Sequence, residues 1–421
     1  MSSSLLDLAQ ALIRVPSLTP VTPDLLPAAS RSLDLLQAFA EAHHGSCERL
    51  RFNGGHARWT YEVDNLFAHW PGDREIGHIC FIGHTDIVPP GDSASWQTDP
   101  FSGEIVGDLL MGRGATDMKS AVAAFCYALG TFLDEQPAQR PTVSLVITTD
   151  EEWAAVNGTK RVLNWMRSKS IAPDYVLIGE PSSPEIFGTH IKIGRRGSLN
   201  GVVRAEGVQG HAAYPDLFIN PNRSLIAALA RIQSHIWDDS LEGMPATSVE
   251  ITAYRSGDFN QTAIIPSTAE ALWNIRFTPQ QSVGTLVTLM EKLLEDTSGP
   301  NKGTSAGAMA ALEVRANVDS VSMPYYSPAA SFAQLVIDSV ATTTGSAPIV
   351  DAAGGTTDGR FVGSAFPNAQ IVELGLPENG GHTASRDRGG MHQIDECCSV
   401  SDLVKLSKSY GRILKRMVSR T

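Results

Sequence analysis

Short apolar runs recur along the chain and predict buried strands. Four of them are nearly continuous, at 78–86 (HICFIGHTD), 142–152 (TVSLVITTDEE), 175–181 (YVLIGEP) and 369–375 (AQIVELG). Such runs are typical of strands that are covered on both faces of a sheet. Helical patterns lie between them, at about 118–135 and 158–169. This alternation predicts an α/β fold with helices on both faces of the sheet.

The middle of the chain has a different pattern. The segments 198–208 and 269–279 alternate apolar and polar residues, as strands with one wet face do. The segments 220–238 and 282–297 have helical spacing, and a stretch rich in Gly, Ser and Ala follows. We therefore predict a first domain formed by 1–196 and 313–421, interrupted by an inserted α+β domain at 197–312.

Length, charge and cysteine content narrow the function classes. The 421 residues favour two domains, and the formal net charge of −12 without a basic stripe argues against a nucleic-acid partner. The five cysteines include no CxxC pair, which argues against a disulfide framework and a thiolate zinc site. The first residues predict an amphipathic helix that ends before Pro16, and no apolar segment is long enough to cross a membrane. We therefore expect a cytoplasmic protein without a membrane partner.

Carboxylates and histidines follow the predicted strands. They are His84 and Asp86 after the first strand, Asp150, Glu151 and Glu152 after the second, Glu180 after the third, Asp117 in a glycine-bearing loop and the late His392. Ligands of open α/β sheets bind beyond the carboxyl ends of the strands. Imidazoles and carboxylates without thiolates are typical of catalytic zinc, cobalt or manganese sites.

Several of these residues also have a purely structural interpretation. His84 alone would be a buried core histidine, Asp117 would cap the following helix, and Glu180 would form an ion pair at a strand end. Three adjacent acids beyond an apolar strand are nevertheless costly without compensating cations, and two divalent metals would supply them. One acid can bind metal while its neighbour takes a proton from a water.

Five motifs occur in an order that we know from one protein family. GHTDIVPPGD, GRGATDMKS, TTDEEW, GEPSS and MHQIDECCSVSDL together resemble the di-zinc aminoacylase and carboxypeptidase family, over nearly the whole chain. GRRGSLNG, GVQGHAAYPD, NPNRSL and GGTTDGRF are similar to one branch of that family. The resemblance implies a mixed-sheet catalytic domain, an inserted domain that serves as dimer interface and lid, and two Zn²⁺ ions per subunit.

The resemblance also implies which residues hold the metals. His84, Asp117 and Glu180 would bind one zinc, and Asp117, Glu152 and His392 would bind the other, with Asp117 bridging. Cobalt or manganese would fit the same oxygen-rich ligands.

Further roles follow from the same resemblance. Glu151 would be the general base and acid, and Asp86 would be the partner of His84. His211 would reach the active site of the other subunit and stabilise the oxyanion. Arg196 and Arg360 are candidates to bind the carboxylates of a small anionic substrate.

The chain departs from the family at two places. Ala263, in NQTAIIP, stands where many relatives have an asparagine. The segment 377–391 adds a second histidine, His382, but we prefer His392 as ligand because the residues after it continue the family pattern. In the family the bond after the aspartate of the loop is cis, so Asp117–Met118 is predicted to be cis.

Three classes of function remain open at this point. The branch motifs favour hydrolysis of an N-acyl amino acid with several carboxylates. The same metal centre would also serve deacetylation of N-acetylornithine or hydrolysis of a dipeptide. A non-catalytic dimeric binding protein is the third class, although each ligand position and Glu151 carry a competent residue.

Overall fold

The chain forms two compact units in the computed structural model, which describes residues 4–56, 59–137, 139–295, 309–328, 331–381 and 387–419. The first unit comprises Met1–Gly194, Tyr326–Asp351 and Thr357–Thr421, and the second comprises Arg195–Tyr325 with Ala352–Thr356. The predicted insertion at 197–312 lies inside the second unit, which extends further along the chain.

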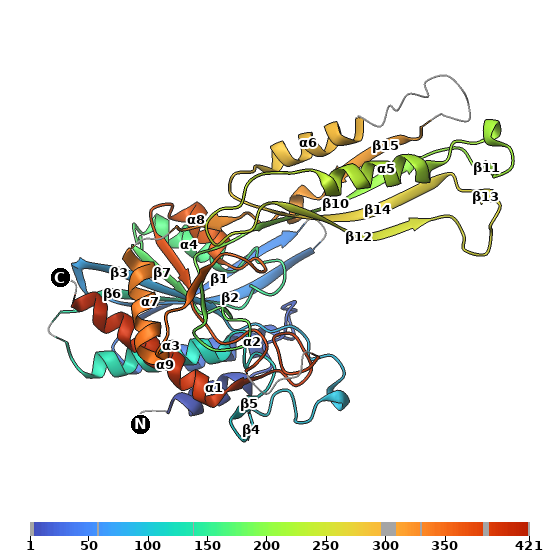
Figure 1. Cartoon of the computed structure of the whole chain (residues 1–421). Helices are drawn as coiled ribbons and strands as arrows, with labels where there is room; N and C mark the ends of the chain where they lie inside the picture. The colour runs from blue at the N-terminus through green and yellow to red at the C-terminus, as the bar shows by residue number, and fades with distance from the viewer. Residues whose placement is uncertain are drawn as a thin grey trace. The chain divides into compact units, whose positions relative to one another are not determined.

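An eight-stranded sheet is the centre of the first unit (Figure 1). From edge to edge its strands are β1 (Ser46–His56), β2 (Trp59–Trp70), β6 (Pro141–Thr148), β3 (Asp73–His84), β7 (Tyr175–Ile178), β18 (Gln370–Glu373), β8 (His190–Lys192) and β17 (Ile349–Asp351). The helices of this unit are α1 (Leu5–Ile13), α2 (Leu26–Ala42), α3 (Lys119–Asp134), α4 (Thr159–Ser168), α7 (Ser331–Thr344), α8 (Gly359–Ala365) and α9 (Val400–Val418). A separate small sheet contains β4 (Ile105–Val106), β5 (Leu109–Met111) and β19 (Cys397–Ser399).

The large sheet is mixed, as predicted. Strands β6, β3, β7 and β18 run parallel to one another, whereas β1 and β2, and β2 and β6, pair antiparallel. Helix α3 packs against β3 and α9, and α4 packs against β6 and α8. Phe81 of β3 stacks on Phe125 of α3 with ring centroids 4.2 Å apart, which anchors the helix on the sheet.

The second unit has its own core. Its antiparallel sheet has the order β12 (Ser248–Ser256), β14 (Thr268–Phe277), β10 (Gly197–Glu206) and β15 (Ala311–Ala316). Helices α5 (Pro221–Ser234) and α6 (Val283–Glu295) cover one face of it and bury Trp273. The side chain of Asn220 caps α5 and Pro221 occupies its first turn, which explains where this helix begins. A short pair, β11 (Gly210–His211) with β13 (Ile264–Ile265), extends from this unit.

Most elements agree with the sequence-based predictions. The four buried strands, the two helices between them and the N-terminal helix are present, and the last ends at Ile13, before Pro16. All five cysteines are free thiols. Among the described residues, no helix has the length and apolar character needed to cross a membrane. The long hairpin of β1 and β2 was not predicted, because charged and polar residues interrupt the apolar residues along its strands.

His78 of β3 makes the stability of the fold depend on pH. Its ring contacts Ser144 Oγ at 2.7 Å and Ala172 O at 3.2 Å. Burial lowers the pKa of His78 to about 4, from the 6.5 of an unperturbed histidine. Between about pH 4 and pH 6.5, this histidine binds a proton in the unfolded chain but not in the folded chain. Stability is therefore lost as the pH falls from 6.5 towards 4, by about 3 kcal/mol at about 1.4 kcal/mol per pKa unit.

We expect His78→Gln to reduce this dependence. Urea unfolding of the metal-free protein at pH 7.5 and pH 5 would show a smaller loss of stability for H78Q than for the wild-type protein. Removing metal beforehand keeps ligand protonation at other histidines from dominating the comparison. Equal losses for the two proteins would show that His78 does not carry this part of the pH dependence.

Candidate metal centre

Neighbouring strand ends bring the candidate ligands together. His84 is the last residue of β3, Glu180 lies two residues after β7, and Glu152 follows β6. These three strands run parallel, so their carboxyl ends lie at one edge of the sheet. Asp117 comes from the loop before α3, which packs on β3.

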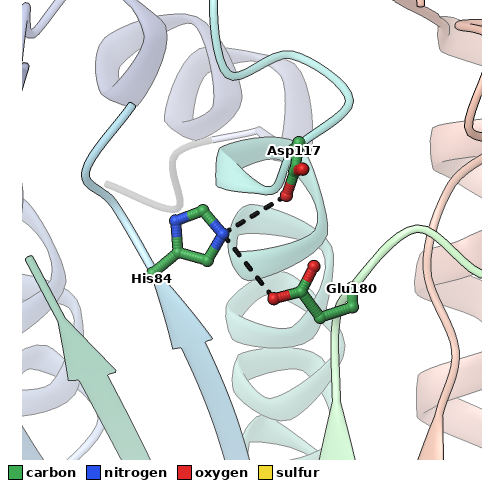
Figure 2. A group of neighbouring side chains, drawn as sticks. All are labelled: His84, Asp117 and Glu180. Carbon is green, nitrogen blue, oxygen red and sulfur yellow. Dashed lines mark hydrogen bonds and ion pairs between the residues drawn. The ribbon is translucent and has the colours of Figure 1, made fainter. Parts of the chain in front are cut away.

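The first group contains His84, Asp117 and Glu180, all of them buried (Figure 2). His84 Nε2 lies 3.2 Å from Asp117 Oδ1 and 3.7 Å from Glu180 Oε1. One imidazole nitrogen and two carboxylate oxygens therefore converge on a single point. Ligand atoms of all three residues lie within 4.8 Å of one another, as the first shell of a small cation requires.

The second group shares Asp117 with the first. It consists of Asp117, Glu152 and His392, again with ligand atoms within 4.8 Å of one another. His392 Nε2 lies 2.9 Å from Glu152 Oε1 and 3.6 Å from Asp117 Oδ2. Asp117 thus turns Oδ1 to one histidine and Oδ2 to the other, which is the arrangement of a carboxylate that bridges two cations.

Asp86 contacts residues of both ligand groups. Its main-chain oxygen lies 3.0 Å from Nδ1 of His84, and since a carbonyl only accepts, this nitrogen carries the proton and Nε2 is left free to bind metal. Its carboxylate lies 3.6 Å from the same nitrogen and accepts the main-chain N–H groups of Glu151 and Glu152. Asp86 therefore orients His84 and also fixes the turn that presents the two glutamates.

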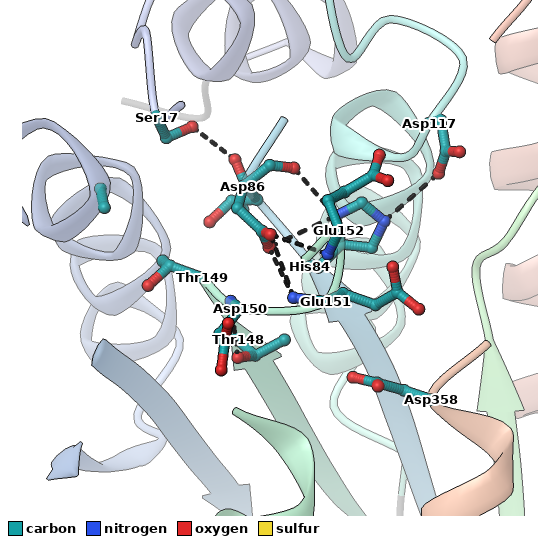
Figure 3. Close-up of polar contacts among 12 residues, drawn as sticks. Ser17, His84, Asp86, Asp117, Thr148, Thr149, Asp150, Glu151, Glu152 and Asp358 are labelled. Atoms are coloured by element: carbon teal, nitrogen blue, oxygen red, sulfur yellow. Dashed lines mark hydrogen bonds and ion pairs between the residues drawn. The ribbon is translucent and has the colours of Figure 1, made fainter. Parts of the chain in front are cut away.

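Glu151 belongs to neither ligand group among the described residues. The charges of Asp358 and His84 both act on its carboxylate, and Figure 3 draws the three side chains together. Its carboxylate is 3.9 Å from Nη1 of Arg360, and Nη2 of the same arginine lies 3.8 Å from Asp358 Oδ1. Burial and the charge of Asp358 raise the pKa of Glu151 well above its usual range. A carboxylate of raised pKa beside a metal site is suited to accept and return a proton.

The electrostatics of the centre favour bound cations. Burial and the charge of Asp117 raise the pKa of Glu180 well above its usual range and also raise that of Glu152. Burial alone would lower the pKa of His84, but Asp117, Asp86 and Glu180 together raise it well above the usual value. Burial and the charge of the neighbouring carboxylate thus favour the protonated form of each glutamate. Divalent metals at the two groups would replace those protons, so the residues fit a two-metal centre.

Asp150, the first of the three adjacent acids, points away from the ligands. Its carboxylate accepts the hydroxyl of Tyr61 at 2.9 Å and the main-chain N–H of Asn157 at 2.9 Å. Burial raises the pKa of Asp150 to about 7. Asp150 therefore ties the β1–β2 hairpin to the turn that carries Glu151, a role that the sequence reasoning did not identify.

A buried lysine near the centre was also missed. Lys119 has no exposed surface, and its Nζ donates to the carbonyl of Val15 at 2.7 Å. Burial lowers the pKa of Lys119 to about 7, although the charges of Asp86 and Glu396, two buried carboxylates near the ligands, act to raise it. The motif GRGATDMKS contained this residue, but only its aspartate has the residue type expected of a ligand.

The remaining candidates belong to the second unit or lie outside the described residues. Arg196 donates from Nη1 to Ala246 O at 3.0 Å and to Ser248 Oγ at 3.1 Å. His211 is exposed on β11, and the neighbouring Ala212 N–H donates to Ala263 O at 2.9 Å, so the departure at Ala263 lies beside His211. His382 lies outside the described residues.

Two local features concern Asp117. The peptide bond Asp117–Met118 is cis, as the resemblance predicted. Helix α3 has Met118 at its N-cap and no capping side chain, so the alternative of Asp117 as a helix cap is wrong. Its carboxylate is instead directed to the two histidines.

Comparison with known proteins identifies the family. A model of peptidase family M20/M25/M40 matches residues 80–416. The chain belongs to this family. Curated relatives of this chain include two succinyl-diaminopimelate desuccinylases. The one from Rhodospirillum centenum is 37% identical over 409 residues, covering 97% of this chain and 96% of the relative. The one from Methylorubrum populi is 38% identical over 422 residues, covering 98% of each.

Solved structures of other proteins share the fold. An M20 family metallo-carboxypeptidase from Sulfolobus solfataricus has a TM-score of 0.72 at 17% identity, covering 99% of each chain. Human carnosine dipeptidase 1 has a TM-score of 0.71 at 17% identity, covering 99% of this chain and 96% of that one. At this identity the likeness shows the fold alone.

Proposed function

We propose that the protein is a di-zinc amidohydrolase that cleaves N-succinyl-LL-2,6-diaminopimelate into succinate and LL-2,6-diaminopimelate, a step of diaminopimelate and lysine biosynthesis. The proposed metal chemistry rests on one observation: the two carboxylate oxygens of Asp117 face two different histidines. The relatives that match nearly the whole chain support the choice of substrate.

His84, Asp117 and Glu180 would hold one zinc, and Asp117, Glu152 and His392 the other. The same oxygen-rich ligands would accept cobalt or manganese. Bound metals would polarise the amide carbonyl and make water a stronger nucleophile near neutral pH. Asp86 serves both groups, since it holds the ring of His84 and the main chain at Glu152.

Glu151 would move the proton. Its carboxylate would accept a proton from the attacking water and return it to the nitrogen of the leaving amine. The nearby Arg360 and Asp358 limit the positions that this carboxylate can adopt. The raised pKa of Glu151 suits it to carry the proton between the two steps.

Three further residues would contact the substrate, two to bind it and one to stabilise the oxyanion. Arg360 and Arg196 are the candidates for its carboxylates, since a guanidinium group binds a carboxylate through two hydrogen bonds. His211 would stabilise the oxyanion in the active site of a partner subunit. The proposal thus includes a homodimer formed by the second unit, in which β12 is an edge strand and Tyr254 and Leu272 are exposed. The second unit would also act as a lid, and the enzyme would work in the cytoplasm.

A competition between two substrates tests the choice of reaction. We expect the zinc-loaded protein, offered equal amounts of N-succinyl-LL-2,6-diaminopimelate and N-acetyl-L-ornithine, to release succinate much faster than acetate. Both products are measured in the same reaction, so that the ratio of the two kcat/KM values follows directly. E151Q, prepared in parallel, controls for a contaminating hydrolase.

Faster release of acetate would contradict the proposed substrate while leaving the metal centre intact. In that case Ala263 is the first residue to examine, since its carbonyl accepts the N–H of Ala212, the residue after His211. Release of neither acid by a protein that binds two zinc ions would contradict the proposed reaction.

A further inference from the structure

A buried ion pair lies behind the two ligand groups. Arg113 Nη1 is 2.5 Å from Glu396 Oε2, and neither side chain is more than 3% exposed. The two residues meet because β19 pairs with β5, with Cys397 opposite Met111. A buried charge pair of this kind is costly unless its remaining hydrogen-bonding groups are satisfied. Arg113 Nε has no hydrogen-bond partner among the described residues, and the further bonds of the pair go to the main chain around two metal ligands.

One oxygen of Glu396 holds the loop that carries Asp117. Oε1 accepts the main-chain N–H groups of Gly114 at 3.1 Å, Thr116 at 3.0 Å and Asp117 at 3.2 Å. The hydroxyl of Thr116 adds a bond to the carbonyl of Cys397 at 2.6 Å. Three N–H groups that converge on one charged oxygen fix the path of this loop, and with it the direction of the bridging carboxylate.

The guanidinium of Arg113 reaches the second ligand. Nη2 donates to the main-chain carbonyl of His392 at 3.3 Å. The backbone of His392 has a φ of 62°, in the left-handed region that a residue with a side chain adopts only at a cost. A fixed hydrogen bond to its carbonyl helps to keep this residue in that conformation, which turns its ring to Glu152.

We propose that the Arg113–Glu396 pair is a positioning element that holds the side chains of Asp117 and His392 in the orientations needed to bind two metal ions. Glu396 acts on both ions, because it fixes the bridging Asp117. Arg113 acts mainly on one ion, through His392. This inference rests on the proposed two-metal function and assigns to the pair a role that is separate from ligation.

Metal affinity of single variants tests the pair. Arg113→Lys keeps the charge but removes the planar guanidinium group, whose Nη1 and Nη2 bond Glu396 and His392 separately. We expect R113K to bind one zinc ion about 10–100-fold more weakly and to change the affinity for the other by less than about threefold. Glu396→Gln is expected to weaken both ions by about 10–100-fold. Competition with a chromophoric chelator measures the two affinities, and excess zinc should restore most of the kcat of R113K.

Arg49→Lys is the matched control, since Arg49 pairs with the fully buried Asp64 elsewhere in the same unit. R49K should bind both ions as the wild-type protein does. Wild-type affinities in R113K and E396Q, or equal losses in R113K and R49K, would overturn the inference. If E396Q does not fold, Glu396→Asp replaces it, because the shorter side chain keeps the charge but withdraws the oxygen that accepts the three main-chain N–H groups, and unchanged affinities there would also overturn the inference. A wild-type protein that binds no metal would instead overturn the proposed function, and the inference with it.

Discussion

Replacing Glu151 with glutamine is expected to lower kcat by about 10²–10⁴-fold while both metal ions stay bound. The amide has nearly the shape of the carboxylate but cannot take a proton from water. Glu151 belongs to neither ligand group of the described residues, so ligation does not depend on its charge. Its main-chain N–H, which donates to Asp86, is unchanged by the substitution.

Asp150→Asn provides the matched control one position earlier. Asp150 is a buried acid like its neighbour, but it faces Tyr61 and Asn157 rather than the ligands. D150N should lower the unfolding temperature and retain at least about a tenth of the wild-type kcat, because it supports the turn without handling the proton. Steady-state kinetics and metal analysis on the same samples separate the two effects. An E151Q enzyme that turns over at the wild-type rate would exclude Glu151 as the base.

The positions of the ligands were predictable because they follow strands. His84 and Glu180 come directly after apolar runs, and parallel strands bring such positions to one edge. The sequence pattern did not show which of the three adjacent acids faces the metals, because the chain leaves the sheet after Thr148 and strand alternation no longer applies. The resemblance to a family, rather than periodicity, distinguished Glu151 from Glu152.

The supporting residues could not be predicted from local patterns. Arg113 and Glu396 are 283 positions apart in the sequence, and only the pairing of β5 with β19 brings them together. Similarly, Tyr61 meets Asp150 across a hairpin whose strands gave no apolar run. Ligands are recognisable by residue type and by the end of a strand, whereas the groups that orient them depend on tertiary pairing.

Replacing Asp117 with asparagine is expected to remove both metal ions. Its two oxygens face different histidines, so the amide loses the negative charge for both sites and one ligand atom for one of them. Loss of a residue that only supports a ligand typically lowers metal affinity by about 10–100-fold. The affinity of D117N for each ion should fall by more than this. Glu180→Gln is the control, since Glu180 belongs to the first group alone and its loss should leave about one ion bound.

Thermal unfolding with and without zinc checks this result independently of activity. A metal that binds only the folded protein raises its unfolding temperature, and the rise grows with affinity. Zinc should therefore stabilise the wild-type protein strongly, E180Q less, and D117N hardly at all. The order matters more than the size of each shift, because it follows from the number of groups that each residue joins. If D117N and E180Q lost the same part of the stabilisation, Asp117 would serve one metal only and the two groups would not share a bridge.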